Sequence, residues 1–180
     1  LKLDEKGNVN EEMNSLNESF DLGLTEEQCS NTAFSAKFLN RPMRFCGMVV
    51  NEGQPGGGPF WVKSSDGLDQ RQIIEKAQLS SQPEQMKLVV RSTHFNPNEI
   101  VCSVKDYKGN KHDLLNFSDP DKYFVVHKNL NGEKITFIEK PGLWNGGMAD
   151  WLTIFYEIDR SCFSPVKTVL DLLKDEHKED

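Results

Sequence analysis

The sequence contains no apolar run that approaches the roughly 18 residues of a membrane-spanning helix. It also lacks the succession of basic, apolar and small residues that forms a secretory leader. Basic residues are in the minority, with 21 lysines and arginines against 28 aspartates and glutamates and a net charge of -7. A surface of this sign does not favour sequence-independent binding to nucleic acid. We therefore predict a cytoplasmic protein with no membrane and no nucleic-acid partner.

The motifs of metal sites and phosphate loops are missing as well. There is no CxxC pair and the four histidines show no HExxH spacing, so no metal site is predicted. The glycine-rich segments lack the lysine that follows the glycines of a P-loop. The cysteines lie far apart and are predicted to be reduced, mostly buried thiols: Cys29, Cys46, Cys102 and Cys162.

The length and the apolar content bound the domain organisation. With 180 residues, of which 37% are hydrophobic, the chain can bury the core of one domain. Residues 1–24 are rich in Asn and Glu with little periodicity, and we predict a polar lead-in or linker there. The domain is predicted over residues 25–174, with a charged tail at 175–180. Because the polar run begins at Leu1, we expect the chain to be a piece of a longer protein.

Short strands dominate the middle of the chain. Seven segments have the length and the β-branched or aromatic content of strands or buried segments: 43–50, 60–63, 86–92, 99–107, 123–128, 134–140 and 151–158. Turns are predicted at Asp66-Gly67, at 108–111 and at 129–134, whereas residues 70–80 fit a strand or a helix. A helix is predicted over 25–38, where Thr25 and Gln28 form a capping-box pattern. The sequence predicts a strand-rich α/β or α+β domain.

The last helix that the sequence predicts contains a lysine in an unusual place. Ser164 is a candidate N-cap and Pro165 suits the first helical position. Lys167 would then lie in the first turn, where the helix dipole favours an anion rather than a cation. The lysine indicates either a bound anion beside it or a solvated surface position.

Two glycine-rich loops are candidate binding segments. The first, NEGQPGGGPFWV at 51–62, combines glycines that let a backbone approach a ligand with prolines that stiffen the chain. The second, GLWNGGMADW at 142–151, offers Asn145 and Asp150 beside two tryptophans, a composition that suits a polar ligand against apolar walls. Each loop is also compatible with a structural turn whose aromatic residues belong to the core.

Three segments resemble the second half of the eukaryotic-type nucleotide-sugar pyrophosphorylases, the UDP-glucose and UDP-N-acetylhexosamine enzymes. FSPVKTVLDLL at 163–173 is similar to their F-x-P-V-K-x-x-x-D-L-L motif, whose lysine contacts substrate phosphate. VKSSDGLDQRQIIEKAQL places Glu75 where the family has a ligand of a sugar hydroxyl, and WNGGMADWLTIFY resembles the segment that lines the sugar pocket. The resemblance implies a catalytic role for Lys167. It also implies a mixed β-sheet with flanking helices, as in the sugar-binding half of a glycosyltransferase-A-like nucleotidyltransferase.

Residues 41–177 also resemble the C-terminal part of an uncharacterised bacterial domain family of the Bacteroidetes type. The shared motifs include NEG.PGGGPFWV, THFNP and PGLWNG.MADW. In this resemblance the first glycine loop and its neighbours line a substrate cleft. The substrate-binding candidates that follow are Glu52, Gly56, Gly57, Gly58, Glu75, His94, Asn96, Asn145 and Asp150.

The resemblance implies nucleotidyl transfer between a nucleoside triphosphate and a sugar 1-phosphate. A lysine charge about 4 Å from a phosphate oxygen contributes roughly 4 kcal/mol at an effective dielectric constant near 20. Mg²⁺ is expected on the substrate phosphates in the full-length protein, with no firm site on this chain. The N-terminal half of the same protein is an expected partner, so this chain alone is predicted to be inactive. The alternatives are a non-catalytic module that binds a nucleotide sugar or sugar phosphate, and an assembly domain whose tryptophan loop packs on a partner.

Overall fold

The computed structural model of the chain describes residues 8–178, apart from 54–56, 64–67, 76–77, 80–81, 96, 143–145 and 167. The α-helices are α1 Val9–Phe20, α2 Glu26–Ser30, α3 Thr32–Leu39 and α4 Pro83–Val90. The strands are β1 Met43–Met48, β2 Gly58–Lys63, β3 Asp69–Ile74, β4 Glu99–Ser103, β5 Phe124–Leu130, β6 Glu133–Glu139 and β7 Leu152–Glu157. Short 3₁₀ helices are η2 Leu114–Phe117, η3 Arg160–Cys162, η4 Val169–Leu173 and η5 Asp175–His177. Within this described part, no helix combines the length and the apolar character that crossing a membrane requires.

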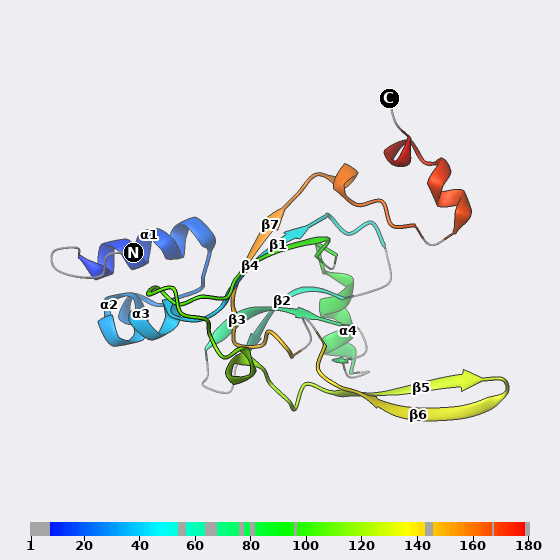
Figure 1. Cartoon of the computed structure of the whole chain (residues 1–180), viewed down its shortest axis with the longest axis horizontal. Helices are drawn as coiled ribbons and strands as arrows, with labels where there is room; N and C mark the ends of the chain where they lie inside the picture. The colour runs from blue at the N-terminus through cyan, green and yellow to red at the C-terminus, as the bar shows by residue number, and fades with distance from the viewer. Residues whose placement is uncertain are drawn as a thin grey trace.

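The central sheet is mixed. Its three strands have the order β4-β1-β7, with β1 antiparallel to β4 and parallel to β7. The pairs β2–β3 and β5–β6 form two separate antiparallel hairpins. Helices α1 to α3 gather at one end of the molecule, apart from α4 (Figure 1). The predicted class, a mixed α/β domain with a mixed sheet and flanking helices, is confirmed.

Two small apolar clusters hold these layers together. The first joins the N-terminal helices to the start of β7 through Met13, Cys29, Phe38 and Leu152, each at most 6% exposed. The second joins the central sheet to the β2–β3 hairpin through Cys46, Met48 and Ile73. The hairpin is therefore fixed to the sheet by buried apolar contacts, which positions the cavities described below.

The structure corrects the prediction that ordered structure begins near residue 25. Residues 9–20 form α1, and the side chain of Met13 on this helix is 1% exposed. Val9 and Leu16 pack on the same cluster, because positions i, i+4 and i+7 share one helix face. The Asn- and Glu-rich composition describes only the outer face of a short amphipathic helix.

The helix predicted over 25–38 is two helices. The capping box of Thr25 and Gln28 is present, as predicted, and opens α2. Asn31 then has an extended backbone and its side chain accepts a hydrogen bond from the N–H of Phe34 at 3.0 Å. The side-chain cap thus satisfies a free N–H group at the start of α3 and allows the chain to change direction after α2.

Most predicted strands are confirmed, and residues 69–74 are a strand rather than a helix. The segment 86–92 is the exception, because Pro83–Val90 is helix α4. Pro83 occupies a first-turn position of α4, where its missing N–H is not needed. None of the eight residues of α4 is buried, so its β-branched residues do not form a core strand. The predicted Asp66-Gly67 turn lies outside the described residues.

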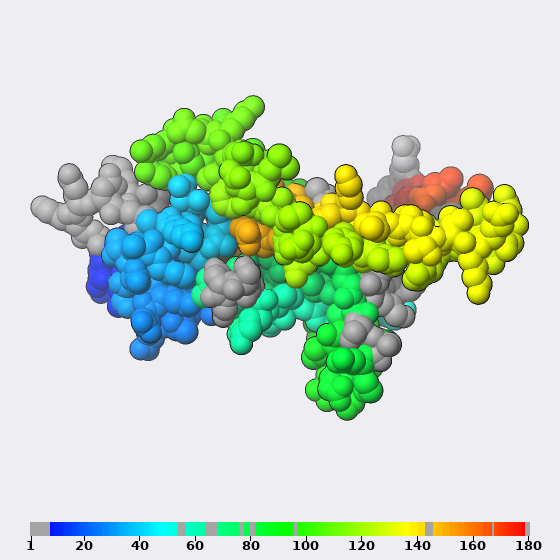
Figure 2. All heavy atoms as spheres, turned by 90° about the horizontal axis from the view of Figure 1, so that it is seen from below, coloured from blue at the N-terminus to red at the C-terminus, as the bar shows by residue number. Residues whose placement is uncertain are grey.

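The hairpin of β5 and β6 extends beyond the rest of the chain (Figure 2). It turns at Asn131 and Gly132, which both have positive φ, at 53° and 89°. Two successive left-handed residues are the requirement of the tightest hairpin turns, and Asn-Gly fits it. The turn predicted at 129–134 is confirmed.

The predicted α-helix that starts at Ser164 is wrong. Residues 163–166 are not helical, and the 3₁₀ helix η4 starts after a capping box between Thr168 and Asp171. The hydroxyl of Ser164 instead forms a hydrogen bond with Nε2 of His177 at 2.8 Å. Val169, Leu170 and Leu173 are 67% to 80% exposed, so no apolar surface of the described chain stabilises a longer helix here.

Candidate functional site

A cavity of about 460 Å³ lies between the β2–β3 hairpin and the end of β7. We call it the histidine pocket. Apolar and aromatic side chains form much of its wall, and polar groups enter it from four segments: Asp21 after α1, Arg71 on β3, Thr93 and His94, and Glu157 on β7. The residues used in the argument below are Asp21, Trp61, Arg71, Thr93, His94, Tyr156 and Glu157.

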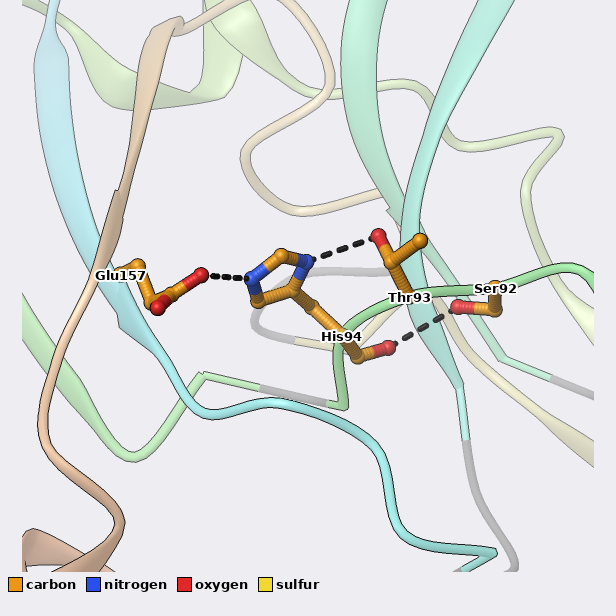
Figure 3. Close-up of polar contacts among 4 residues, drawn as sticks. All are labelled: Ser92, Thr93, His94 and Glu157. Atoms are coloured by element: carbon orange, nitrogen blue, oxygen red, sulfur yellow. Dashed lines mark hydrogen bonds and ion pairs between the residues drawn. The ribbon is translucent and has the colours of Figure 1, made fainter.

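His94 occupies the polar side of this pocket, and both of its ring nitrogens have partners (Figure 3). Nε2 lies 2.9 Å from Oε2 of Glu157, and Nδ1 lies 2.8 Å from Oγ1 of Thr93. With the Nε2–H tautomer, the imidazole donates to the carboxylate and accepts from the hydroxyl. The ring is thereby held in one orientation by two side chains from different parts of the chain.

The end of β1 sets the position of this histidine. Asn51 N–H donates to the carbonyl of Thr93 at 2.9 Å, and Phe95 N–H donates to the carbonyl of Val49 at 3.0 Å. These bonds continue the antiparallel pairing of β1 past its last residue, Met48, and Val50 and His94 form an isolated antiparallel β-bridge. On the other edge of β1, the register pairs Met48 with Glu157. His94 and Glu157 therefore approach each other across the end of one strand.

The first glycine loop supports the pocket through one residue in particular. A Cβ atom on Gly58 would lie 2.7 Å from both the carbonyl oxygen of His94 and Oγ of Ser92. The absence of a side chain thus lets β2 pass against the backbone that carries His94. Gly57 is also buried, whereas Gly56 lies outside the described residues. Glu52 is exposed and pairs with Arg160 at 3.2 Å, so its carboxylate points to η3 and does not line the pocket.

The aromatic wall of the pocket includes Trp61, which is 50% exposed, and Tyr156, which is 69% exposed. The guanidinium of Arg71 lies over the ring of Trp61, 4.9 Å from its centroid. Arg71 also forms an ion pair with Asp21, which follows α1. Burial lowers the pKa of Arg71, but a guanidinium stays charged at any physiological pH.

A second cavity of about 500 Å³ lies along Gln70 and Gln72 of β3, with the loop 118–122 and Asp150 on its other sides. We call it the amide pocket. Gln72 is fixed there, because its Nε2 donates to the carbonyl of Ala149 at 2.7 Å and its Oε1 accepts from Arg44 at 3.1 Å. Arg44 is 0% exposed and forms no ion pair with a carboxylate of the described chain. Its Nε donates to Oγ1 of Thr153 at 2.8 Å.

The candidate residues of the sequence are divided between these places. His94 lies in the histidine pocket and Asp150 in the amide pocket. Glu75 follows β3 and lines neither; its N–H donates to Oε1 of Gln78 at 2.8 Å. Lys167, Gly56, Asn96 and Asn145 lie outside the described residues. The loop of Asp150 also contains Trp151, which is 4% exposed and packs within its own chain rather than on the surface.

Sequence reasoning missed the partners of His94. Its partner Glu157 is the second-last residue of the predicted strand 151–158, and the pocket residue Trp61 lies in the predicted strand 60–63, but neither carries a motif of its own. Their contribution depends on which strands are neighbours, which local patterns do not contain. The one available signal is that each of these strands contains aromatic residues and has a charged residue at or next to its C-terminal end.

The described residues do not fit a metal site held by protein ligands. No three His, Cys, Asp or Glu side chains of the described ranges converge to hold an ion. The described pocket has two carboxylates, and each is engaged: Glu157 by the imidazole of His94 and Asp21 by Arg71. We therefore derive no chemical step through a metal on this chain.

Comparison with known proteins identifies the family. Residues 6–178 match the family described as "Domain of unknown function (DUF4301)", and the chain belongs to this family. The predicted membership of an uncharacterised domain family is thus confirmed. No curated protein matches the chain.

One solved structure with weak similarity is UDP-glucose pyrophosphorylase from Leishmania major, a mutant in complex with UDP-glucose. The TM-score is 0.42 at 17% identity. The match covers 90% of this chain and 38% of that chain, so the present chain spans well under half of that protein.

Proposed function

We propose that this chain is the sugar-phosphate-binding half of a nucleotide-sugar pyrophosphorylase-like protein, and that the histidine pocket holds the sugar. The observation that carries the proposal is the fixed His94, held between Thr93 and Glu157 in a cavity with aromatic walls. The other half of the active site would come from the N-terminal part of the same bacterial, cytoplasmic protein.

The chemistry of the pocket suits a sugar ring. Trp61 and Tyr156 expose apolar ring surface, which can cover the C–H face of a pyranose. Glu157 has a second carboxylate oxygen for a hydroxyl group, since only Oε2 is bound to His94. The hydroxyl of Thr93 lies next to the imidazole and can bond a second sugar hydroxyl.

In the proposed reaction, an oxygen of the sugar 1-phosphate attacks the α-phosphorus of a nucleoside triphosphate, and pyrophosphate leaves. The histidine pocket orients the sugar so that its phosphate approaches in line, which is the main catalytic contribution of positioning. Lys167 would stabilise the negative charge on the transferred phosphoryl group. Mg²⁺ would accompany the substrate phosphates. The remaining groups would lie on the other half, so this chain alone would not turn over.

The test is calorimetric titration of the protein with UDP-glucose, UDP-N-acetylglucosamine and glucose 1-phosphate. We expect binding of at least one of them. Glu157→Gln should weaken it by about tenfold to a hundredfold, the value of one hydrogen bond to a charged group. His94→Leu should weaken it to a similar extent, because Glu157 and Thr93 lose the imidazole that orients them. The matched control is His127→Leu on β5, where the imidazole likewise bonds a threonine hydroxyl, that of Thr136 at 2.9 Å.

The control should leave affinity unchanged. Equal affinity in the wild type and both pocket variants would refute the proposed site. A protein that binds a nucleotide sugar in the histidine pocket and yet, at full length, exchanges no pyrophosphate would instead be the non-catalytic binding module. If the full-length enzyme is active, Lys167→Ala should lower turnover by about a hundredfold or more.

A further inference from the structure

We propose that Arg71 forms an anion subsite of the histidine pocket, and that Asp21 occupies this subsite until a phosphate of the ligand displaces it. The proposal rests on the proposed function for the sugar part of the ligand and adds the group that binds the phosphate. It names a residue pair, Arg71 and Asp21, that no motif of the sequence indicates.

Arg71 has the properties of a preorganised phosphate ligand. Its guanidinium lies over the ring of Trp61, with Cζ 4.9 Å from the centroid, so the cation is held at the pocket wall. Its side chain is only 17% exposed, which strengthens its interaction with any anion that enters. Planar bidentate donors of this kind match the oxygens of a phosphate.

Asp21 is the exchangeable member of the pair. Its side chain is 75% exposed, so it can leave Arg71 and be solvated at little cost. Asp21 also lines the pocket, which places its carboxylate where an anionic group of a ligand would meet Arg71. An exposed carboxylate on a largely buried guanidinium acts as a weak internal competitor of a phosphate.

The turn that carries Asp21 does not depend on the ion pair. The side chain of Asn17 accepts from the N–H of Leu24 at 2.9 Å and donates to the carbonyl of Leu24 at 2.9 Å. Gly23 lies against Trp61 so closely that a Cβ atom would be 2.7 Å from the indole ring. The backbone of Asp21 is left-handed, with φ 47°, a conformation that asparagine tolerates well. Asp21→Asn is therefore expected to fold normally.

Glu157 is the other acidic group of the pocket. The carboxylate of Glu157 pairs with His94, whereas Arg71 pairs only with Asp21 among the ion pairs of the described residues. Removing the Asp21 charge should thus leave a net cation at the Trp61 wall. This predicts an anion preference that the sugar-binding side of the pocket does not share.

The experiment titrates inorganic pyrophosphate, UDP-glucose and methyl α-glucoside into the wild type, Asp21→Asn, Arg71→Gln and Glu18→Gln. Glu18 is exposed on the same helix, α1, so its variant controls for the loss of one acidic charge. We expect Asp21→Asn to raise the affinity for pyrophosphate and UDP-glucose by about twofold to fivefold, the range of a released exposed ion pair. Arg71→Gln should remove pyrophosphate binding, and Asp21→Asn should leave the affinity for methyl α-glucoside unchanged.

The outcomes separate this proposal from the proposed function. If UDP-glucose binds in the histidine pocket but Asp21→Asn behaves like Glu18→Gln, the anion subsite is refuted and the sugar pocket stands. If pyrophosphate binds Asp21→Asn more tightly while no sugar nucleotide binds, the subsite stands and the proposed function fails. Pyrophosphate binding that is absent from both the wild type and Asp21→Asn, or that survives in Arg71→Gln, would also overturn the subsite.

Discussion

Gly58→Ala tests whether the first glycine loop serves the histidine pocket through close packing. Gly58 is the first residue of β2, and its φ lies outside the left-handed region, so alanine can adopt its backbone conformation. Alanine alone would then stabilise the protein by about 0.4 to 1 kcal/mol, because it restricts the unfolded chain. The added Cβ, however, would lie 2.7 Å from the carbonyl oxygen of His94, which belongs to the backbone and cannot rotate away.

The unfavourable effects outweigh that gain. Forcing a methyl group into a filled space costs about 1 to 3 kcal/mol. The same methyl group would displace Oγ of Ser92 from its 2.9 Å hydrogen bond with the carbonyl of His94. Loss of such a bond costs about 0.5 to 1.5 kcal/mol. The net expectation is a loss of about 1 to 3 kcal/mol in the free energy of unfolding, together with a displaced His94 and weaker ligand binding.

The assay is urea denaturation combined with ligand titration, and the control is Gly53→Ala in the same loop. Gly53 has φ 94° and no atom within 4 Å of an added Cβ. Its substitution should cost about 1 to 2 kcal/mol of backbone strain without moving His94, so ligand affinity should persist. A Gly58→Ala protein as stable as the wild type, with unchanged ligand affinity, would show that close packing against His94 has no part in forming the pocket.

Three further predictions concern the core. Burial raises the pKa of the Cys46 thiol to about 11, so as pH rises this thiol loses its proton in the unfolded chain before it does in the folded chain. Between pH 7 and pH 10 this difference should lower the free energy of unfolding by about 1 to 2 kcal/mol. In denaturation curves, Cys46→Ala should lack that part of the decrease. Because Arg44 is buried without a carboxylate partner in the described chain, Arg44→Met should lower the free energy of unfolding by less than about 1 kcal/mol. Gln72→Leu removes an acceptor from the buried Arg44 charge and should lower it by about 2 kcal/mol or more. The reverse order of these two losses in urea denaturation would refute this view of the network. Met13→Ala should cost about 2 kcal/mol or more in thermal or urea unfolding, whereas no change would mean that α1 does not belong to the folded unit.

Those structural features that depend on neighbouring residues in the sequence could be predicted. The capping box of Thr25 and the Asn131-Gly132 turn are complete within a few residues, so their patterns identified them. Helix α4 was missed because a β-branched run suggested a strand, while the decisive signal was Pro83 at its start. The Asn- and Glu-rich composition of residues 1–24 predicts a linker, whereas the spacing of Val9, Met13 and Leu16 is the pattern that indicates helix α1.

The candidate site could be predicted only in part, because it depends on contacts between distant residues. His94 was a candidate from a motif, but its partner Glu157 is 63 positions away. The contact exists because β7 runs parallel to β1, and no local turn signal or residue spacing predicts that pairing. His94 and Asp150, which one resemblance grouped together, lie in different pockets. Alternation along β3 explains this division, because Arg71 faces the histidine pocket whereas Gln70 and Gln72 face the amide pocket.

The end of β1 is consequently the element on which the histidine pocket depends most. One of its edges holds the segment of His94 through the carbonyl of Val49, and the other holds the end of β7, where Ile158 N–H donates to the carbonyl of Met48 at 2.9 Å. A shift of this strand end would move His94 and Glu157 in relation to each other, whereas exposed loops could change without that effect. The geometry of the pocket is thus set by main-chain pairing, and the aromatic and charged side chains on the surrounding strands set the chemistry of its walls.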